Sequence, residues 1–244
     1  MFSHSEIRQE ARAVLRRGDV PFLRFAGLNL LVTAVLNLLD AFCSGTTYED
    51  LFGSGPAGIF VYVLTMLISL VLEAGRVEYC AAAHRGERAE YADLFCGFSY
   101  AIRFITVMML QAVLVGLGFS LFLIPGILLL YRYRFALYIL CEDPSLSATE
   151  ILRRSGEELK GFKGELFLLD LSFLAPAMLC VAPLLLWQYA PLEFSASLPD
   201  VVVTLISTLL TFPSLLLIFY RTAAELGFRS RILQLKYPQQ ETEL

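Results

Sequence analysis

The chain has 244 residues, of which 57% are hydrophobic and only 17% are charged, whereas a water-soluble domain is typically about half apolar and about a quarter charged. A chain of this length lacks the polar surface to enclose so much apolar material in one soluble core. Its formal net charge of −4 also excludes the overall positive charge that is typical of nucleic-acid-binding domains.

The first predicted element is an amphipathic helix at the start of the chain. The Ser-His-Ser-Glu of residues 3–6 fits a capping box, and Ile7, Ala11, Val14 and Leu15 then fall on one helical face. This segment has no apolar core of the kind that a cleavable signal peptide needs. We therefore expect the first hydrophobic block to act as an uncleaved signal-anchor.

The hydrophobic residues fall in blocks of about twenty, the length that crosses about 30 Å of hydrocarbon at about 1.5 Å per residue. We predict six transmembrane helices, over residues 21–42, 57–76, 103–124, 125–141, 165–188 and 199–220. The fourth of these spans is the shortest. The predicted fold is all-α: a polytopic integral membrane helix bundle with short cytoplasmic amphipathic helices, in a single domain over residues 1–244.

A second amphipathic helix is predicted between the fourth and fifth spans. Residues 147–150 again fit a capping box. Such helices either lie on the inner membrane surface or pack against the ends of the bundle. We expect two sets of side chains to differ in environment. The apolar set that faces membrane or protein is Ile7, Val14, Leu15, Ile151 and Leu159, and the charged set that faces water is Glu10, Arg17 and Glu157.

These segments suggest an internal repeat. A surface helix, a glycine stop and a membrane hairpin occur three times, over residues 1–80, 81–143 and 144–225. Gly18 and Gly161 supply the stop in the first and third units. Chance resemblance among amphipathic helices is the alternative.

Lysine and arginine are unevenly distributed among the loops. They gather before the first span and after the last, and in residues 76–103 and 153–163, whereas residues 43–56 and 189–198 contain none. The positive-inside rule then predicts a multi-pass protein of the cell membrane with both termini in the cytoplasm. It also supports the fourth span, without which residues 153–163 would lie outside. A re-entrant pair formed by the third and fourth spans stays an alternative. Such a pair changes how deep the two segments reach into the membrane more than it changes the side on which the flanking loops lie.

Several short motifs along the chain carry a resemblance to a known family. They are Glu-Ile-Arg at 6–8, Leu-Phe-Cys-Gly-Phe at 94–98, Ile-Pro-Gly-Ile at 124–127, Glu-Asp-Pro at 142–144, Leu-Lys-Gly at 159–161 and Phe-Tyr-Arg at 219–221. With them the chain resembles, over nearly its whole length, the bacterial integral membrane family catalogued as domain of unknown function nine-seven-five. At residues 19–21, where the first span begins, it has Asp-Val-Pro, whereas that family is expected to have a sequence similar to Gly-Asn-Trp. The resemblance implies a protein of the bacterial cytoplasmic membrane and supplies no mechanism.

No constellation of catalytic or metal-binding residues is found in the sequence. The chain has two histidines, His4 and His84, and neither has a metal-ligand spacing. The five cysteines are far apart and form no Cys-x-x-Cys pair, which argues against a zinc site or a disulfide framework. Gly116 and Gly118 are interpreted as close-packing points between helices. We therefore predict no catalytic residue, no cofactor and no metal, and a protein that is not an enzyme.

Polar residues inside the spans are the better indication of function, because each is costly in hydrocarbon unless it is paired or hydrated. The candidate intramembrane polar cluster is Glu73, Arg76, Arg132, Arg134 and Asp170. Counting about 1.5 Å per residue puts Arg134 and Asp170 at similar depth. We predict that Arg134 is within ion-pair reach of an acid, with Asp170 the first candidate and Glu73 the second. The pair is interpreted as a structural ion pair, with a substrate or proton site as the alternative.

These observations favour a non-enzymatic membrane protein that acts as a scaffold or partner-binding subunit. The alternative is a small-molecule transporter or permease, and the two differ in whether Arg134, Asp170, Glu73 and Asn29 line one water-accessible cavity or are sealed in packed contacts. The expected partners are the lipid bilayer and either another membrane protein or a second copy of the chain, and not nucleic acid.

Overall fold

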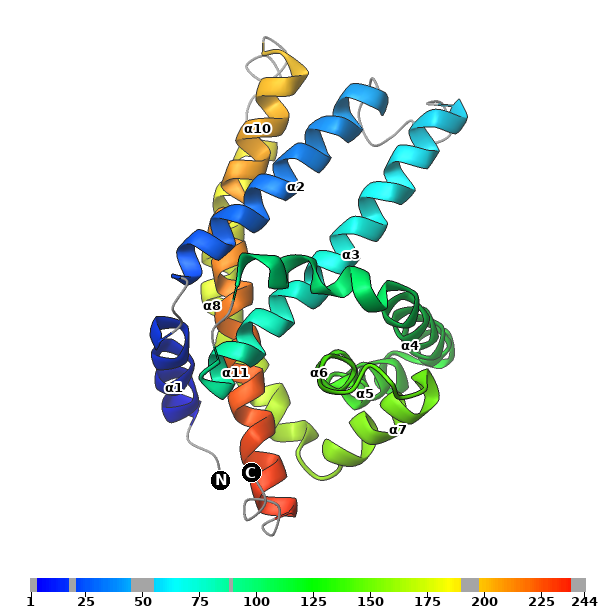
Figure 1. Ribbon diagram of the computed structural model, residues 1–244, viewed down its shortest axis with the longest axis vertical. Coiled ribbons are helices and arrows are strands. Elements are labelled where there is room, and N and C mark those ends of the chain that lie inside the picture. Colours follow the sequence, from blue (N-terminus) through cyan, green and yellow to red (C-terminus); the bar gives the residue numbers. More distant parts are fainter. Residues whose placement is uncertain (1–3, 18–20, 45–54, 88–89, 190–197, 238–244) are drawn as a thin grey trace.

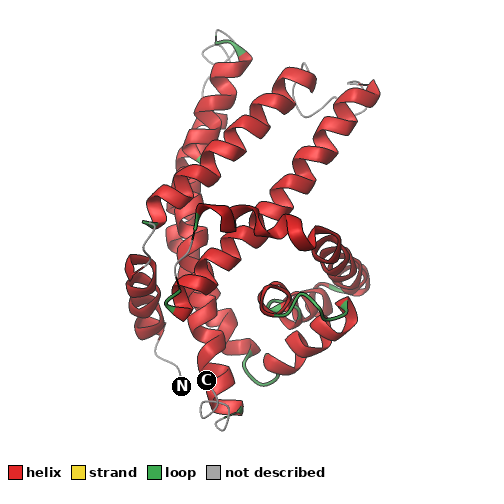
Figure 2. Cartoon of the chain, in the orientation of Figure 1, coloured by secondary structure: helices red, strands yellow, loops and turns green. Residues whose placement is uncertain are grey.

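A computed structural model describes residues 4–17, 21–44, 55–87, 90–189 and 198–237 of the chain. Helices make up nearly all of the described residues, joined by short turns, as Figure 2 shows. In chain order they are α1 (His4–Arg17), α2 (Phe22–Ser44), α3 (Gly55–Arg85), the 3-10 helix η2 (Tyr91–Tyr100), α4 (Ala101–Leu121), α5 (Leu123–Arg132), α6 (Ala136–Glu142), α7 (Ala148–Glu158), α8 (Lys163–Gln188), α10 (Asp200–Leu210) and α11 (Phe212–Lys236). The all-α prediction is confirmed.

Six segments of the described chain are long and apolar enough to cross a membrane. They are Phe22–Phe42, Ile59–Arg85, Tyr91–Leu121, Leu123–Glu142, Lys163–Gln188 and Val201–Lys236. Large apolar side chains such as Phe42, Leu179 and Leu186 are at least 75% exposed on these segments. So much exposed apolar surface requires lipid around it, and the polytopic membrane fold is confirmed.

Two of the predicted spans end far too early. The second continues to Arg85 and the last to Lys236, where the sequence analysis ended them at residues 76 and 220. The extensions hold small or apolar residues that are buried by other helices, such as Ala81, Ala82, Ala223 and Ala224. The membrane helices therefore continue into a packed region that helices α1, α6 and α7 surround.

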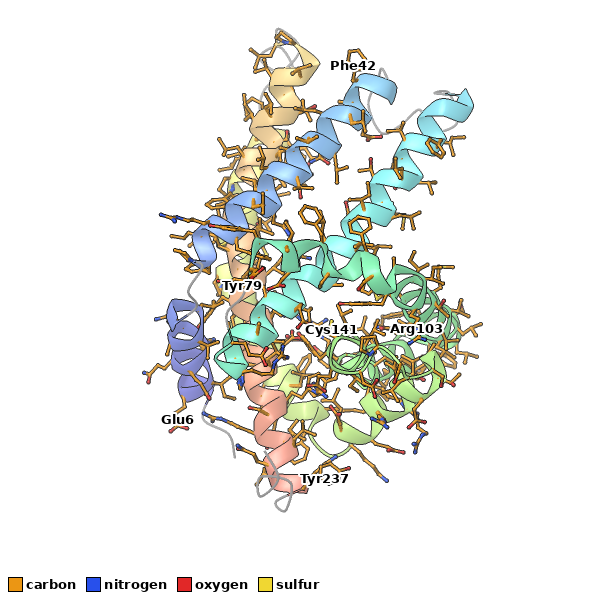
Figure 3. The ribbon with its side chains drawn as sticks, viewed as in Figure 1. Glu6, Phe42, Tyr79, Arg103, Cys141 and Tyr237 are labelled. Atoms are coloured by element: carbon orange, nitrogen blue, oxygen red, sulfur yellow. The ribbon has the colours of Figure 1, made fainter. Side chains whose placement is uncertain are left out.

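That packed region contains the core of the molecule. Phe25 from α2 stacks on Tyr79 from α3 with ring centroids 4.2 Å apart, and Phe219 from α11 meets both rings edge-on at 6.0 Å. All three rings are fully buried. Figure 3 labels Tyr79 between the lower part of α2 and the lower half of α3. The aromatic cluster therefore fixes α2, α3 and α11 against one another on one side of the candidate site.

The fourth span is broken in the middle. Helix α5 ends at Arg132 and α6 begins at Ala136, with a tight turn closed by hydrogen bonds from the Arg134 N–H to the Tyr131 carbonyl and from the Ala136 N–H to the Tyr133 carbonyl, both 3.2 Å. The Phe135 N–H instead donates to the Ser155 hydroxyl of α7 at 3.1 Å. This break turns Arg134 away from the direction that an unbroken helix would give it.

The two surface helices pack against the bundle. On α1 the side chains of Ile7, Val14 and Leu15 are buried, and on α7 and just after it those of Ile151 and Leu159 are buried. Helix α1 lies along the lower half of α11 (Figure 1). Of the two alternatives, the structure supports packing against protein. The prediction for the apolar faces is therefore confirmed.

The predicted charged faces and caps have mixed outcomes. Glu157 is exposed and Glu10 is half-exposed, whereas the Arg17 side chain, the cap at residues 3–6 and Gly18 lie outside the described residues. The cap of α7 is confirmed, because the Glu150 N–H donates to the Ser147 hydroxyl at 3.3 Å. Gly161 has a φ of +95°, as a helix stop requires. The threefold repeat over residues 1–80, 81–143 and 144–225 stays a prediction.

The outer face of α7 is an ion-paired, solvent-facing surface. Arg153 bridges Glu150 and Glu157 at 2.7 and 2.8 Å, and Arg154 also contacts Glu150. Hydrogen bonds from Arg153 and Arg154 lower the pKa of the exposed Glu150 carboxyl to about 2. All four side chains are thus charged at neutral pH, and this face of α7 belongs in water.

Two glycines allow η2 to lie directly on α3. A Cβ atom added at Gly75 would overlap the backbone carbonyl group of Leu94, and one at Gly97 would lie 2.7 Å from the Val71 carbonyl oxygen. Leu94 itself is fully buried. Backbone contact of this kind is available only to glycine, so these two positions determine where η2 crosses α3.

Candidate functional site

A cavity of about 440 Å³ lies between α2, α3 and the start of α11. Its polar lining includes Asn29, Thr33, Ser69, Glu73, Arg76 and Ser214. The remaining wall is apolar, with side chains such as Leu30, Met66 and Leu215. We call this space the α2–α3–α11 cavity.

The charges in the cavity come from one turn of α3. Glu73 and Arg76 are three residues apart on the helix and form an ion pair. The Arg76 side chain is 13% exposed and that of Glu73 is 39% exposed, so the carboxylate is the more accessible of the two. The two residues lie together as their spacing predicts.

Two buried N–H donors in the cavity wall have no hydrogen-bond partner among the described residues. They are Nδ2 of Asn29 and Nε of Arg76. Asn29 is only 4% exposed. A buried donor left unpaired costs about 1–3 kcal/mol, and native proteins usually satisfy such groups with water or a ligand. The cavity therefore has unused capacity to donate hydrogen bonds.

Two hydroxyl groups of the wall are already engaged as donors. The Thr33 hydroxyl donates to the Asn29 carbonyl at 2.9 Å, and the Ser214 hydroxyl donates to the Cys180 carbonyl at 3.3 Å. Their oxygens keep lone pairs and can still accept. The buried N–H donors of the wall that have no partner among the described residues are thus Nδ2 of Asn29 and Nε of Arg76.

A second polar group, the central cluster, is built around the buried Glu225 of α11. Arg134 donates to both carboxylate oxygens, at 2.6 and 3.2 Å. The Tyr138 hydroxyl donates to Oε2 at 2.8 Å, and Nε of Arg221 donates to Oε1 at 3.0 Å. Glu225 is 3% exposed. Four charge-assisted hydrogen bonds thus compensate the burial of this carboxylate.

The central cluster continues to Asp170 on α8. Arg221 donates to Oδ1 of Asp170 at 2.8 Å, and the Tyr131 hydroxyl donates to Oδ2 at 3.0 Å. The prediction that Arg134 pairs with an acid is confirmed, but both named candidates are wrong, because that acid is Glu225. The break after α5 directs Arg134 toward α11, and α11 continues past residue 220 to supply Glu225.

A third polar group, the C-terminal cluster, surrounds Arg229. This buried arginine contacts Glu142 at the end of α6 at 2.6 Å and Glu158 at the end of α7 at 2.7 Å. Lys236 donates to the backbone carbonyls of Glu157 and Glu158 at 2.6 and 2.8 Å. The cluster ties the C-terminal part of α11 to the ends of two shorter helices.

The five residues of the predicted polar cluster therefore lie in three places. Glu73 and Arg76 line the cavity, and Arg134 and Asp170 belong to the central cluster. Arg132 packs against α7 instead: its carbonyl accepts a hydrogen bond from the Ser155 hydroxyl at 3.0 Å, and its guanidinium lies 5.7 Å from the ring centroid of Tyr133. The structure therefore divides the predicted cluster among three different surroundings.

Glu225 and Arg229 were missed because they were counted in the cytoplasmic tail. A signal for them exists in the sequence. Arg221, Glu225 and Arg229 recur every four residues on one helical face, and the small or apolar residues between them, such as Ala223 and Ala224, are typical of a buried helix. Regular charge spacing among such residues indicates paired buried charges rather than a loop.

The corrected pairing can be tested with two double-mutant cycles. We expect Asp170→Asn and Arg221→Gln to couple by about 0.5–3 kcal/mol in the free energy of unfolding, the range for residues in one network. Asp170→Asn and Arg134→Gln should couple less, because Arg134 pairs with Glu225 and Asp170 pairs with Arg221. Unfolding in mixed micelles measures both cycles, and equal coupling in the two cycles would contradict the assignment.

Among the described residues, no group of three or more His, Cys, Asp or Glu side chains is placed to hold a metal ion. His84 instead lines a small second cavity of about 130 Å³ with Arg85, Glu142 and Arg229. This space lies beside the C-terminal cluster, and its charged lining is already paired.

Comparison with known protein families matches residues 119–236 to the family model described as Protein of unknown function (DUF975). This confirms the resemblance seen in the sequence, over the segment from the end of α4 through α11, although the expected resemblance covered nearly the whole chain. No curated protein and no solved structure matches the chain. The matched segment contains all of the central and C-terminal clusters but only the α11 wall of the cavity.

Proposed function

We propose that this chain, a polytopic membrane protein with the DUF975 match over residues 119–236, is a non-enzymatic small-molecule transporter or permease whose termini are both cytoplasmic. The observation that carries the proposal is the α2–α3–α11 cavity. It lies between three candidate spans and contains a charged pair and two unpartnered buried donors. Polar groups at membrane depth are costly, and those that line a cavity typically mark a substrate or ion pathway.

The lining indicates the chemistry of the occupant. Asn29 and Arg76 offer N–H donors, so an occupant needs acceptor oxygens such as those of a carbonyl, carboxylate or phosphate group. The apolar side chains of Leu30, Met66 and Leu215 form the rest of the wall and favour a molecule that also has an apolar part. A small amphipathic molecule with an acceptor-rich end fits both requirements.

The same geometry supports the scaffold hypothesis less well than the transporter hypothesis. The scaffold hypothesis expected Arg134, Asp170, Glu73 and Asn29 to be sealed in packed contacts, whereas the transporter hypothesis expected all four to line one cavity. Arg134 and Asp170 are indeed in such contacts, within the central cluster, but Asn29 and Glu73 line the cavity. This division supports a protein in which the charge clusters hold the helices together while a separate cavity receives a ligand.

Water access to the cavity is the first test. In a variant whose native cysteines are replaced by alanine, Ser69→Cys places a thiol in the cavity wall. We expect it to react readily with a small charged thiol reagent. The control is Ala26→Cys, because Ala26 is fully buried on α2, one turn from Asn29. If both thiols are equally inert, the cavity is sealed, and a scaffold that binds another membrane protein or a second copy becomes the better proposal.

Ligand recognition is the second test. Proteoliposomes are incubated with a small-molecule extract of bacterial cells, and the retained compounds are identified by mass spectrometry. Asn29→Leu removes one donor, so the apparent affinity for a retained compound should fall roughly threefold to tenfold, the value of one hydrogen bond. Asn37→Leu is the matched control, because Asn37 lies on the same helix but donates to Thr208 at 3.1 Å. Identical uptake by the wild type and Asn29→Leu would contradict the assigned role.

A further inference from the structure

Helices α4 and α5 form a hairpin with an apolar reversal. From residue 104 to residue 130 the polar side chains are those of Thr106, Gln111 and Ser120, and no charged residue occurs. The four residues at the reversal, Leu121, Phe122, Leu123 and Ile124, are between 67 and 76% exposed. An apolar tip of this size is unsuited to water, although a connection between two complete spans normally lies at the aqueous interface.

Some of the backbone groups at the reversal are hydrogen-bonded within it. The Phe122 N–H donates to the Gly118 carbonyl at 3.1 Å, and the Gly126 N–H donates to the Phe122 carbonyl at 3.2 Å. Pro125 has no N–H in the first turn of α5, where such a group would lack a partner. The Ser120 hydroxyl donates to the Gly116 carbonyl at 3.0 Å. Each of these bonds removes a polar group that would be costly in hydrocarbon.

The two limbs are packed closely enough to insert together. A Cβ atom added at Gly126 would lie 2.5 Å from the Phe119 ring, and one at Gly118 would lie 3.0 Å from the Cα of Gly126. Small residues at such contacts drive association of helices in lipid. Gly118 is therefore a close-packing point as predicted, whereas Gly116 has open space around it.

Charged groups surround only the base of the hairpin. Arg103 at the start of α4 donates to the Pro144 carbonyl, and the Ser155 hydroxyl of α7 holds the Arg132 carbonyl at the end of α5. Figure 3 labels Arg103 beside this base. The ten residues of α5 extend only about 15 Å, so α5 by itself is too short to cross the hydrocarbon.

The direction of the hairpin also differs from that of the other spans. In Figure 1, α4 and α6 are seen nearly end-on, whereas α2, α3, α10 and α11 are seen from the side, with their axes close to the plane of the picture. If those helices cross the bilayer, α4 and α5 cannot cross it along the same direction. Together with the apolar tip, this places both ends of the hairpin on the side where α7 meets water.

We infer that the α4–α5 hairpin does not cross the bilayer, and that its reversal at residues 121–124 is embedded among lipid acyl chains within one leaflet. The remaining four of the six candidate spans then make the crossings. Four is an even number, so both termini stay on one side. The partner of this exposed apolar surface is the hydrocarbon of the lipid and not another protein.

The single tryptophan of the chain, Trp187, makes the depth measurable. In a Trp187→Phe background, Leu123→Trp places a fluorophore at the tip of the hairpin in the full-length protein. The matched control is Phe42→Trp, at the exposed end of the α2 span. Each variant is reconstituted in vesicles of phosphatidylcholine that carries bromine at a defined chain position, and is also titrated with aqueous iodide.

We expect the probe at residue 123 to be quenched most by bromine deep in the chains and weakly by iodide from either side. The probe at residue 42 should show the reverse. Shallow quenching of the residue 123 probe, with iodide access from the outer side, would mean that the hairpin crosses the bilayer. Weak quenching by every brominated lipid would mean that protein or water, rather than lipid, covers the tip. Either result overturns the inference.

Discussion

Replacing Glu225 with glutamine is expected to lower the free energy of unfolding by about 3–5 kcal/mol, the cost of removing one partner from a buried ion pair. The substitution preserves shape but removes the charge that Arg134 and Arg221 share. Two guanidinium groups would then compete for a neutral acceptor in a buried site. The measurement is unfolding of the purified protein in mixed micelles, followed by circular dichroism.

Glu157→Gln is the matched control for this prediction. Glu157 also pairs with an arginine, at 2.8 Å from Arg153 on α7, but its side chain is 56% exposed. Exposed pairs contribute about 0–1 kcal/mol. If the two variants lose the same stability, burial of the central cluster does not determine its contribution, and the structural role assigned to Glu225 is wrong.

Gly75→Ala is expected to destabilise the protein by about 1–3 kcal/mol, the usual cost of inserting a carbon atom into a filled contact. The added Cβ would overlap the backbone carbonyl group of Leu94. A flexible side chain could move aside, but a helix backbone cannot do so without displacing η2 from α3. The temperature at which the detergent-solubilised protein aggregates should fall, as measured by size-exclusion chromatography after heating.

Gly116→Ala is the control for Gly75→Ala. Gly116 also lies within a helix, but an added Cβ would meet no atom within 4 Å. Alanine is the better helix former by about 1 kcal/mol, so this variant should be as stable as the wild type or more stable. A similar loss of stability in both variants would show that glycine flexibility, and not contact between η2 and α3, is the property that matters.

The membrane helices could be predicted from sequence because a block of about twenty apolar residues is uncommon outside membrane-spanning segments. The residues at which these helices end could not be predicted. Arg221, Glu225 and Arg229 have the composition of a loop, and only their partners on other helices, such as Asp170 and Glu142, allow them to be buried. A hydropathy scale scores each residue by itself, so it does not register that an ion pair with another helix offsets the cost of burying a charge.

The candidate site shows the same limit in another form. Counting residues predicts similar depths for Arg134 and Asp170 but not the direction in which either side chain points. The break at residues 133–135 rotates Arg134 toward α11, and nothing in the local sequence marks that break with a proline or glycine. Glu73 and Arg76 were grouped correctly because both lie on one helix, where spacing alone fixes their separation.

One helix carries a wall of the cavity and both charge clusters. Ser214 lines the cavity, and Glu225 and Arg229 lie further along the same continuous α11, about 17 and 22 Å away at the helical rise. Moving the upper end of α11 outward would therefore strain the ion pairs at its lower end. Breaking those pairs would cost free energy, so they oppose outward movement of this wall of the cavity.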